Sequence, residues 1–424
     1  MSSKTKSTAA KEGARPAMVP KLRFPEFWET EGWALEAGDS LFGQINDRNP
    51  EPGLPVLAIT QEHGAIPRRM IDYHVSVTEK SLESYKVVRV GDFIISLRSF
   101  QGGVEYSNYH GICSPAYVIL RRRGEGSDEY FRHYLKTDRF IRILTKNLEG
   151  LRDGKMISYA QFSELKLPIP KPAEQQKIAE CLGSADEIIA AQARKVDALK
   201  THKKGLLQQL FPREGETQPR LRFPEFQNAG EWVERRLDTL CDIQRGKFSH
   251  RPRNDPSFFG GQYPFIQTGD VVKSAGGAVI ASQSLNEQGL AVSKLFKPPI
   301  VLITIAANIG DTGLLQTEGC FTDSVVGLIP KKDVIPVFLE LMMRGQKERL
   351  NKVATTGAQK NINNEILRGV SLLLPLLAEQ QRIASCLSSL DALITTETQK
   401  LEVLKSHKKG LQQQLFPSTE RVTA

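Results

Sequence analysis

The stretch HKKGLLQQLFP, residues 202–212, returns near the end of the chain as HKKGLQQQLFP, residues 407–417. Ten of the eleven positions are identical, and the two copies lie 205 residues apart (407 − 202). A run of this kind is too specific to arise twice by chance. An internal repeat has to be settled first, because a missed repeat leads to the wrong fold.

The repeat extends well beyond this phrase. Its near-identical parts are PKLRFPEF (20–27) with PRLRFPEF (219–226), and LPIPKPAEQQKIAECL (167–182) with LLLPLLAEQQRIASCL (372–387). The interiors agree only in outline, as GDFIISLRSFQGG (91–103) and PPIVLITIAANIGD (298–311) show. Where the copies agree, they are expected to do the same structural job. Where they differ inside a common frame, each is expected to read a different target.

Composition indicates a folded protein with an anionic partner. The 424 residues exceed one ordinary core and favour two or three domains. Hydrophobic residues make up 40% and charged residues 25%, as in globular proteins. The net charge of +9 favours a nucleic acid, although charge alone does not decide this because many basic proteins bind no anion.

The cysteines and the N-terminus favour a cytoplasmic protein without a membrane anchor. The five cysteines are scattered and form no C-x-x-C pair, which is typical of reduced thiols. Residues 1–19 are polar and basic, so we expect a flexible tail and no secretion signal. No stretch approaches about 18 apolar residues, the length that a membrane-spanning helix needs.

Heptad-spaced apolar residues follow each AEQQ run and predict two long helices. The first covers residues 173–210, between Pro172 and Pro212, and the second is its repeat between Pro375 and Pro417. Periodicity sustained over more than four heptads indicates a coiled coil. A polar residue interrupts it at equivalent places, Gln192 and Glu397 (397 − 192 = 205). Such a polar pair lowers stability but can fix the register of the two helices.

Charge favours antiparallel packing of these helices. An antiparallel pair is expected to set Glu174 near Lys408 and Lys409, and Glu379 near Lys203 and Lys204. A parallel pair would instead place the two Lys-Lys pairs side by side, which is repulsive.

The segments between the helices predict mixed α/β domains. Short β-branched runs are expected to be buried strands: DFIISL (92–97), AYVIL (116–120), IVLITIA (300–306) and SVVGLI (324–329). One amphipathic helix per copy is expected at 128–147 and 336–353, followed by turn-rich hairpins at 149–158 and 355–363. The predicted fold class is α+β: two α/β domains separated by two long helices that form an antiparallel coiled coil, with an internal pseudo-two-fold repeat.

The expected division of the chain follows from these elements. It comprises the tail 1–19, a first domain 20–172, a central helix 173–218, a second domain 219–377, and a C-terminal helix with its tail 378–424.

No enzyme motif is complete. The chain has neither G-x-G-x-x-G nor a P-loop, and RGKF (245–248) lacks the upstream glycine loop. NDPSFF (254–259) falls short of an amino-methyltransferase motif because it lacks the second proline. Asp153 with Glu164-Leu165-Lys166 imitates a nuclease cluster, but the second copy has no acidic residue at the equivalent places. We therefore predict no catalytic residue and no metal ligand.

Basic and amide side chains beside the variable strands suggest DNA contacts. Lys155 and Lys360 are repeat equivalents (360 − 155 = 205), so both are expected to bind phosphate, a duty that the copies would share. Base readers are expected where the copies differ, since Arg, Gln and Asn can pair bidentately with base edges. These candidates are Arg98, Ser99 and Gln101 in the first copy and Thr304 and Asn308 in the second. Arg245 and Lys247 are basic residues of the second copy that are also expected to contact DNA. A solvated surface charge is the alternative for any single one.

Two variable units that alternate with two near-identical helices, opening on AEQQKIAECL and AEQQRIASCL, resemble the specificity subunit of type I restriction–modification systems. The resemblance covers nearly the whole chain from Pro20 to Pro417. It implies a non-catalytic DNA-recognition subunit that reads a bipartite sequence in double-stranded DNA, one half-site per variable domain. It also implies partners, two methyltransferase subunits and restriction subunits, which would bind S-adenosylmethionine and ATP. No cofactor is then expected in this chain.

Two other classes stay open from the residues alone. In the first, the chain is a coiled-coil scaffold or regulatory protein whose globular domains bind proteins, and its DNA affinity would not depend steeply on salt. In the second, it is a self-contained restriction or methylation enzyme, which the missing cofactor motif disfavours.

Overall fold

The computed structural model describes residues 18–71, 82, 84–146, 157–306, 308–355 and 362–417. They form two units. Unit 1 contains the described residues up to Arg194 together with those from Thr398 onward, and unit 2 is Lys195–Glu397. Each unit therefore contains part of both long helices, α7 (Pro172–Leu210) and α14 (Leu377–Leu415), which are 39 residues long. The first helix matches the predicted range 173–210 to within one residue, and the second lies between Pro375 and Pro417 as predicted.

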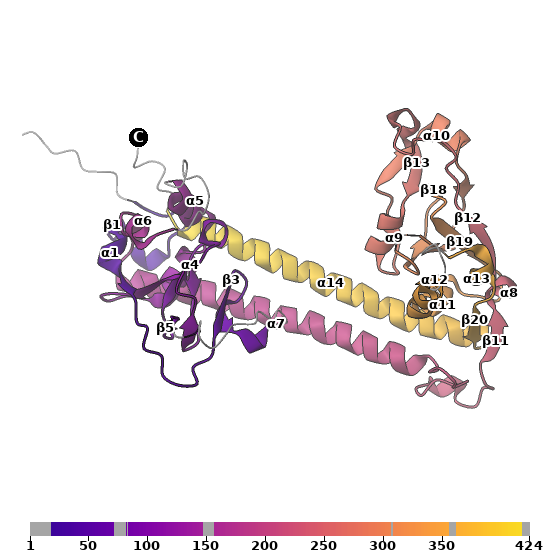
Figure 1. Ribbon diagram of the computed structural model, residues 1–424, viewed down its shortest axis with the longest axis horizontal. Helices are drawn as coiled ribbons and strands as arrows, with labels where there is room; N and C mark the ends of the chain where they lie inside the picture. The colour runs from indigo at the N-terminus through magenta and orange to yellow at the C-terminus, as the bar shows by residue number, and fades with distance from the viewer. Residues whose placement is uncertain are drawn as a thin grey trace, which may run out of the picture. The chain divides into compact units, whose positions relative to one another are not determined.

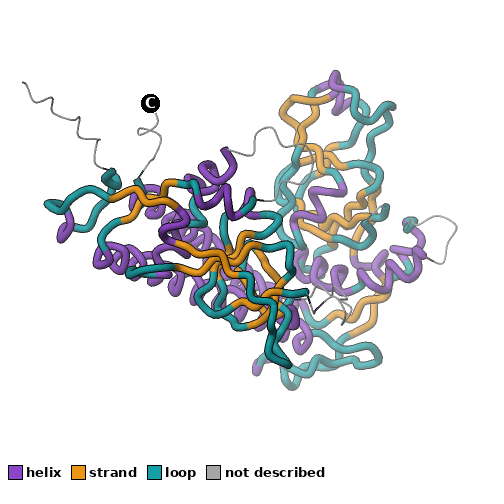
Figure 2. The backbone as a smooth tube through the Cα atoms, turned by 60° about the vertical axis from the view of Figure 1, so that its left-hand side comes forward, coloured by secondary structure: helices purple, strands orange, loops and turns teal. Residues whose placement is uncertain are grey.

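Each unit is built on an antiparallel four-stranded sheet, and the strand order is equivalent in the two units. The strands are drawn as arrows in Figure 1 and in orange in Figure 2. In unit 1 the order is β2 (Phe42–Ile45), β9 (Val118–Arg122), β6 (Phe93–Ile95) and β7 (Glu105–Tyr106). In unit 2 the order is β12 (Cys241–Arg245), β19 (Val325–Pro330), β16 (Ile300–Thr304) and β17 (Thr312–Leu315). The four predicted strand runs all lie in these sheets. Their central strands are buried because both faces are covered, which explains the continuous apolar runs.

The units differ in what they add to this sheet. A two-stranded ladder closes each of them: β1 (Ala34–Ala37) with β10 (Lys166–Ile169), and β11 (Val233–Arg236) with β20 (Ser371–Leu374). Unit 1 adds β3 (Leu57–Thr60) with β4 (Gly64–Pro67), and β5 (Lys86–Val88) with β8 (Gly111–Cys113). Unit 2 adds a second sheet of β14 (Gln283–Leu285), β13 (Phe259–Ile266), β18 (Gly319–Phe321) and β15 (Leu295–Phe296).

The amphipathic helix predicted after each sheet is in fact two helices. Unit 1 has α4 (Asp128–Tyr134) and α5 (Asp138–Lys146), and unit 2 has α11 (Pro336–Gly345) and α12 (Lys347–Thr355). In unit 1 the break is made by Thr137, whose side-chain oxygen accepts a hydrogen bond from the Phe140 N–H and caps α5. The prediction of one continuous helix was wrong because a single threonine cap does not disturb the apolar pattern around it.

The remaining helices of the described residues are short. They are α1 (Gly38–Leu41), α3 (Ser99–Gly102), α6 (Tyr159–Ser163), α8 (Leu237–Leu240), α9 (Thr268–Ser274), α10 (Glu287–Ala291) and α13 (Asn364–Arg368). Single 3-10 turns lie at Pro25–Phe27, Arg68–Met70, Pro224–Phe226 and Pro256–Phe258.

A buried ion pair joins the LRFPEF segment to the start of a long helix in each unit. In unit 1 the Arg23 guanidinium donates to both carboxylate oxygens of Glu174, at 2.8 Å each. In unit 2 Arg222 donates to Glu379 at 2.8 and 2.7 Å. All four side chains are at most 8% exposed. The glutamate of AEQQ therefore belongs to this joint.

The glutamine that follows each glutamate closes the same joint from the other side. Gln175 accepts a hydrogen bond from the Ser127 N–H at the start of α4, and Gln380 accepts one from the Ile335 N–H at the start of α11. The side-chain amide of Gln175 also donates to the Pro170 carbonyl. The AEQQ segment thus connects α7 to the start of α4 in unit 1 and α14 to the start of α11 in unit 2.

The repeated phrase ends each long helix inside a domain core. In unit 1 Leu415 and Phe416 are buried in the main cluster, and Phe416 contacts Tyr130 and Tyr134. In unit 2 Leu210 is buried in the corresponding cluster, with Phe211 against Trp232 and Phe338.

The LRFPEF segment is bound next to these ends. The Leu22 N–H donates to the Gln414 carbonyl, and the Leu221 N–H donates to the Gln209 carbonyl, at 3.0 Å in both units. The phrase and the segment are therefore repeated together because they contact each other.

Within each unit the helices run antiparallel, as predicted. In unit 2, Lys195 pairs with Glu397 and Lys203 with Asp391, so rising numbers on one helix meet falling numbers on the other. In unit 1, Lys408 pairs with Asp186, the repeat equivalent of the second pair. The predicted partners were wrong: Glu174 and Glu379 bind arginines, while Lys408 pairs with Asp186 and Lys203 with Asp391.

Breaking one joint is expected to destabilise the protein strongly. Replacing Glu379 with Ala leaves the Arg222 charge buried and unpaired, which should lower the free energy of unfolding by about 3–5 kcal/mol. The urea midpoint measures this. The control is Glu225→Ala, which removes the exposed partner of Arg382 and should cost about 1 kcal/mol or less. Equal effects of the two substitutions would contradict the assigned role of the buried pair.

Replacing the polar residues of the helix seam should raise thermal stability. Gln192 and Glu397 occupy heptad core positions and are 8% and 9% exposed. Changing both to Leu should add about 1–4 kcal/mol, since apolar packing replaces desolvated polar groups and Lys195, half exposed, stays solvated. Thermal unfolding is the measurement, with Glu402→Leu on an exposed position as control. An unchanged or lower unfolding temperature would show that these side chains stabilise the seam.

Candidate nucleic-acid interface

In unit 1 the predicted base readers lie on the turn that follows β6. Arg98 and Gln101 are exposed, whereas Ser99 is 1% exposed and its side-chain oxygen accepts a hydrogen bond from the Ser96 N–H. Gly103 ends the turn at φ 79°, and a Cβ there would lie 2.2 Å from the Leu135 carbonyl oxygen. The turn is thus pressed against the end of α4. Ser99 shapes it from inside, which revises its predicted role as a reader.

The equivalent turn of unit 2 follows β16. Thr304 is fully buried, and its hydroxyl oxygen accepts a hydrogen bond from the Asp311 N–H at 3.0 Å. A base cannot reach this side chain, so its predicted reading role is also revised. Asn308 is exposed at the tip. Lys347 of α12 holds the turn through Asp311 at 2.6 Å. In both units, therefore, the junction of the two domain helices supports the turn.

Arg245 and Lys247 lie at the end of β12, and both are exposed. The Arg245 side chain donates to the Asp323 carbonyl, and the Asp323 carboxylate pairs with Arg253 at 2.7 Å and Arg251 at 3.5 Å. One aspartate thus gathers three arginines on one surface. The sequence pointed to Arg245 and Lys247 but not to Asp323, since a single aspartate in a loop forms no pattern.

The two predicted phosphate contacts, Lys155 and Lys360, lie outside the described residues, as does most of each predicted turn-rich hairpin.

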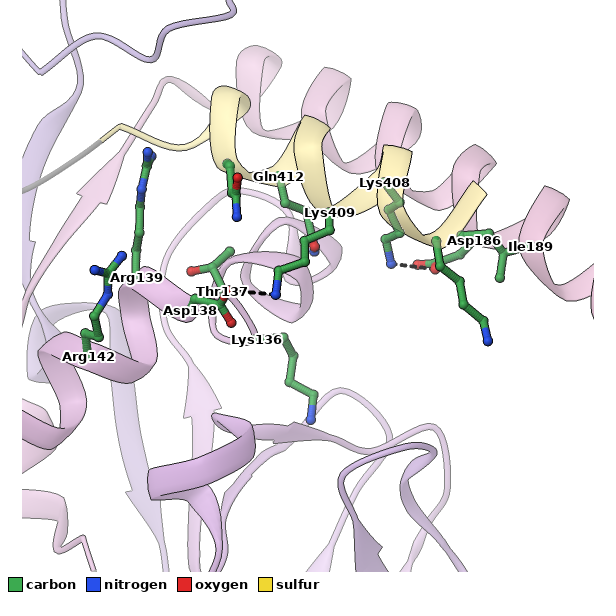
Figure 3. Close-up of a pocket in the computed structure, with 12 residues that line it drawn as sticks. Lys136, Thr137, Asp138, Arg139, Arg142, Asp186, Ile189, Lys408, Lys409 and Gln412 are labelled. Carbon is green, nitrogen blue, oxygen red and sulfur yellow. Dashed lines mark hydrogen bonds and ion pairs between the residues drawn. The ribbon is translucent and has the colours of Figure 1, made fainter. Parts of the chain in front are cut away.

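Unit 1 also contains a basic groove of about 610 Å³ between α5 and the end of α14 (Figure 3). Six cations line it: Lys136, Arg139, Arg142, Lys405, Lys408 and Lys409. Lys409 pairs with Asp138 at 3.0 Å, Lys408 with Asp186, and the Arg139 guanidinium donates to the Phe416 carbonyl. The Lys-Lys pair of the repeated phrase lies on the α14 side of this groove, but from the sequence it indicated only the direction of the two helices.

Lys136 connects the groove to the reading turn. Its ammonium group donates to the Gln61 carbonyl at 3.1 Å and to the Glu105 carboxylate at 2.6 Å, while the Gln61 amide donates to the Arg98 carbonyl at 3.4 Å. Glu105 is 2% exposed. Burial raises the pKa of Glu105, and Lys136 opposes that rise. The lysine is therefore both a groove residue and the counter-ion of a buried acid.

His133 lies behind the groove. It is 4% exposed, with Nδ1 at 3.8 Å from Asp186. Burial lowers the pKa of His133 to about 4; the charge of Lys408 adds to this and that of Asp186 opposes it. The imidazole is therefore neutral at physiological pH.

Reactive or metal-binding groups do not stand out in the described part of the chain. It contains no cluster of three or more His, Cys, Asp or Glu suited to a metal ion. Burial raises the pKa of Cys113 and of Cys241 to about 12, so these thiols stay protonated. Within the same residues, no helix has the length and apolar character required to cross a membrane.

Comparison with known proteins identifies the family. The family model described as the type I restriction modification DNA specificity domain matches residues 36–201 and 229–406. The chain belongs to this family. Membership confirms the predicted specificity subunit of a type I restriction–modification system, with two recognition domains and two long helices.

The specificity subunit resembles relatives over nearly its full length. It is 24% identical over 440 residues to the type I restriction enzyme MjaVIII specificity subunit of Methanocaldococcus jannaschii. This alignment covers 95% of each chain. The S subunit of a type I system from M. genitalium has the same fold, with a TM-score of 0.56, 15% identity, and 94% and 99% of the chains covered.

A chain from a structural study of assembly and conformational transition in a type I system also shares the fold. Its TM-score is 0.58 at 20% identity, with 91% and 98% covered. Because the relatives are named for specificity, the prediction that this subunit is not itself an enzyme is confirmed.

The neutral His133 predicts a particular acid sensitivity. Since its pKa is lowered on folding, the unfolded chain binds a proton near pH 6.5 that the folded unit does not bind until about pH 4. Its share of stability is therefore intact above pH 6.5 and is lost as the pH falls toward 4, by roughly 3 kcal/mol. Unit 2 has Leu341 at the equivalent place, six residues after Ile335 as His133 is six residues after Ser127. The variant His133→Leu should therefore reduce the loss of stability between pH 7.0 and 4.5, measured by urea unfolding at both pH values. An identical pH dependence in the variant would contradict this.

Proposed function

We propose that this specificity subunit reads an asymmetric, bipartite sequence in double-stranded DNA, one half-site per unit. One observation carries the proposal: the units share a sheet order and a set of joints, yet differ in the side chains on equivalent turns. Unit 1 presents Arg98 and Gln101, and unit 2 presents Asn308. Because one framework carries two different surfaces, the two half-sites should differ in sequence.

The proposed roles follow the chemistry of the exposed groups. Arg98, Gln101 and Asn308 are proposed to contact base edges, since these side chains match base edges bidentately. Arg245 and Lys247 are proposed as DNA contacts of unit 2, on the surface that Asp323 organises. Lys155 and Lys360 remain proposed phosphate contacts.

The partners proposed are those of the family. Two methyltransferase subunits and restriction subunits would assemble on this chain, and S-adenosylmethionine and ATP would bind to them, so that the chain itself needs no cofactor. The related chain from a study of type I complex assembly supports an assembled state. Action in the cytoplasm fits a DNA partner and five free thiols.

Exchanging one interior should change one half-site. Residues 38–165 lie between β1 and β10, so replacing them with the interior of another family member keeps the Arg23–Glu174 ion pair and both strands of the β1–β10 ladder. Methylation mapping of DNA from cells that also express the methyltransferase partner should then show one new half-site and one unchanged. Changes in both would contradict the assignment of one unit to one half-site. As a control, the purified chain alone should transfer no methyl group from S-adenosylmethionine.

A further inference from the structure

We propose that the basic groove of unit 1 and its repeat equivalent in unit 2 bind the sugar-phosphate backbone of DNA. The specificity subunit would then carry two sequence-independent anchoring sites beside its reading turns. This inference rests on the proposed DNA-reading function and names a surface that sequence reasoning did not assign.

The charge of the groove suits a polyanion. Its lining contains six cations and two carboxylates, a formal charge of +4 (6 − 2). Each carboxylate is already paired with one lysine, Asp138 with Lys409 and Asp186 with Lys408. Lys405 and Lys409 are 51% and 62% exposed, so their ammonium groups face solvent with donors to spare. Charge-assisted hydrogen bonds to phosphate are the strong kind that such groups make.

The same cations return in unit 2. On the long helices Lys405, Lys408 and Lys409 correspond to Lys200, Lys203 and Lys204, each 205 residues earlier (405 − 200). The ion pair of Lys408 with Asp186 returns as that of Lys203 with Asp391.

The domain helices repeat their part of the lining as well. Their offset of 208 is set by the hydrogen bonds of Ser127 to Gln175 and of Ile335 to Gln380 (335 − 127). Up to the break between the two domain helices, this offset pairs Lys136 with Arg344. Four of the six cations, Lys136, Lys405, Lys408 and Lys409, therefore have a cation at the equivalent position of unit 2.

The cations are retained in both units although the reading turns differ, so the group that they bind should not depend on base sequence. Phosphates are the part of DNA that is the same at both half-sites, and phosphate contacts set the register of a protein on the duplex. Lys136 joins this groove to the Arg98 turn through Gln61, so a backbone contact there would lie next to the proposed base contacts.

The lining favours DNA over a protein occupant. Among the described residues that line it, Ile189 is the one aliphatic residue and none is aromatic. Protein–protein interfaces are depleted of Lys and enriched in aromatic residues at their centre, whereas protein–DNA interfaces are polar and strongly positive. An acidic face of a methyltransferase subunit is the competing occupant, and the test has to separate the two.

The test uses matched double variants of the full-length chain. Lys405→Gln with Lys409→Gln alters unit 1, and Lys200→Gln with Lys204→Gln alters unit 2 at the equivalent positions; all four lysines are exposed. The control, Lys166→Gln with Lys171→Gln, removes the same charge from exposed positions that do not line the groove. Binding is measured from 0.05 to 0.3 M salt, on a duplex with the mapped methylation sequence and on a shuffled duplex.

Each groove variant should flatten the slope of log affinity against log salt by about 1.8, and the control should not change it. Affinity for both duplexes should fall by the same factor, about one to two orders of magnitude at 0.1 M salt, and the methylation map should stay unchanged. A slope equal to that of the control overturns the proposal. So does unchanged DNA binding with weaker capture of purified methyltransferase subunits, which would make the groove a protein interface, or a loss confined to the mapped sequence.

The same measurements distinguish failure of the groove proposal from failure of the proposed DNA-reading function. If the groove variants behave like the control while the unaltered chain still prefers the mapped duplex, only the groove proposal falls. If the unaltered chain together with its methyltransferase partner shows no preference between the duplexes, the proposed DNA-reading function fails.

Discussion

The buried ion pair of Arg23 with Glu174, repeated as Arg222 with Glu379, is the contact on which each unit depends. Two charges this deep in a protein need each other, since either one left alone would keep its full desolvation cost. The arginine donors that remain are also used. Arg23 donates to the Thr30 and Glu31 carbonyls, so the same guanidinium fixes the turn that leads into β1. Domain entry and helix start are therefore positioned together.

A fixed joint lets the domain interior diverge without losing the fold. The clearest case is the buried acid beside the domain helix. In unit 1 it is Glu105 on β7, neutralised by Lys136. In unit 2 the residue equivalent to Glu105 is Thr312 on β17, and the buried acid is instead Glu340 on α11. Glu340 binds both Thr312 and Arg344. Burial raises the pKa of Glu340 as it does that of Glu105. The cation stays in place, so the groove keeps its charge while its counter-ion changes position.

Sequence reasoning succeeded where the signal was local and failed where a distant segment decides. The long helices and central strands could be predicted because heptad spacing and β-branched runs are read within one window. The partner of Glu174 could not be predicted, because Arg23 is 151 residues away in the sequence. Helix periodicity indicates only which residues of the other long helix lie nearby. Ser99 and Thr304 were chosen by residue type, but their burial depends on how each turn folds back on itself. The groove combines α5 with α14 and has no signature in either helix alone.

These contacts explain why the sequence HKKGLxQQLFP occurs twice in the chain. In HKKGLxQQLFP the first lysine crosses the helix seam to an aspartate, as Lys203 to Asp391 and Lys408 to Asp186. The carbonyl of the second glutamine of the Gln-Gln pair binds the LRFPEF backbone, and the phenylalanine packs into a domain core. The lysine also occupies a core position of the heptad, where a charge is costly unless a residue of the opposite charge faces it on the other helix. In the observed register that residue is Asp391 or Asp186. A shift of one helix along the other would leave the lysine desolvated and without its aspartate. The phrase therefore couples helix register to domain attachment, and each unit needs its own copy of it.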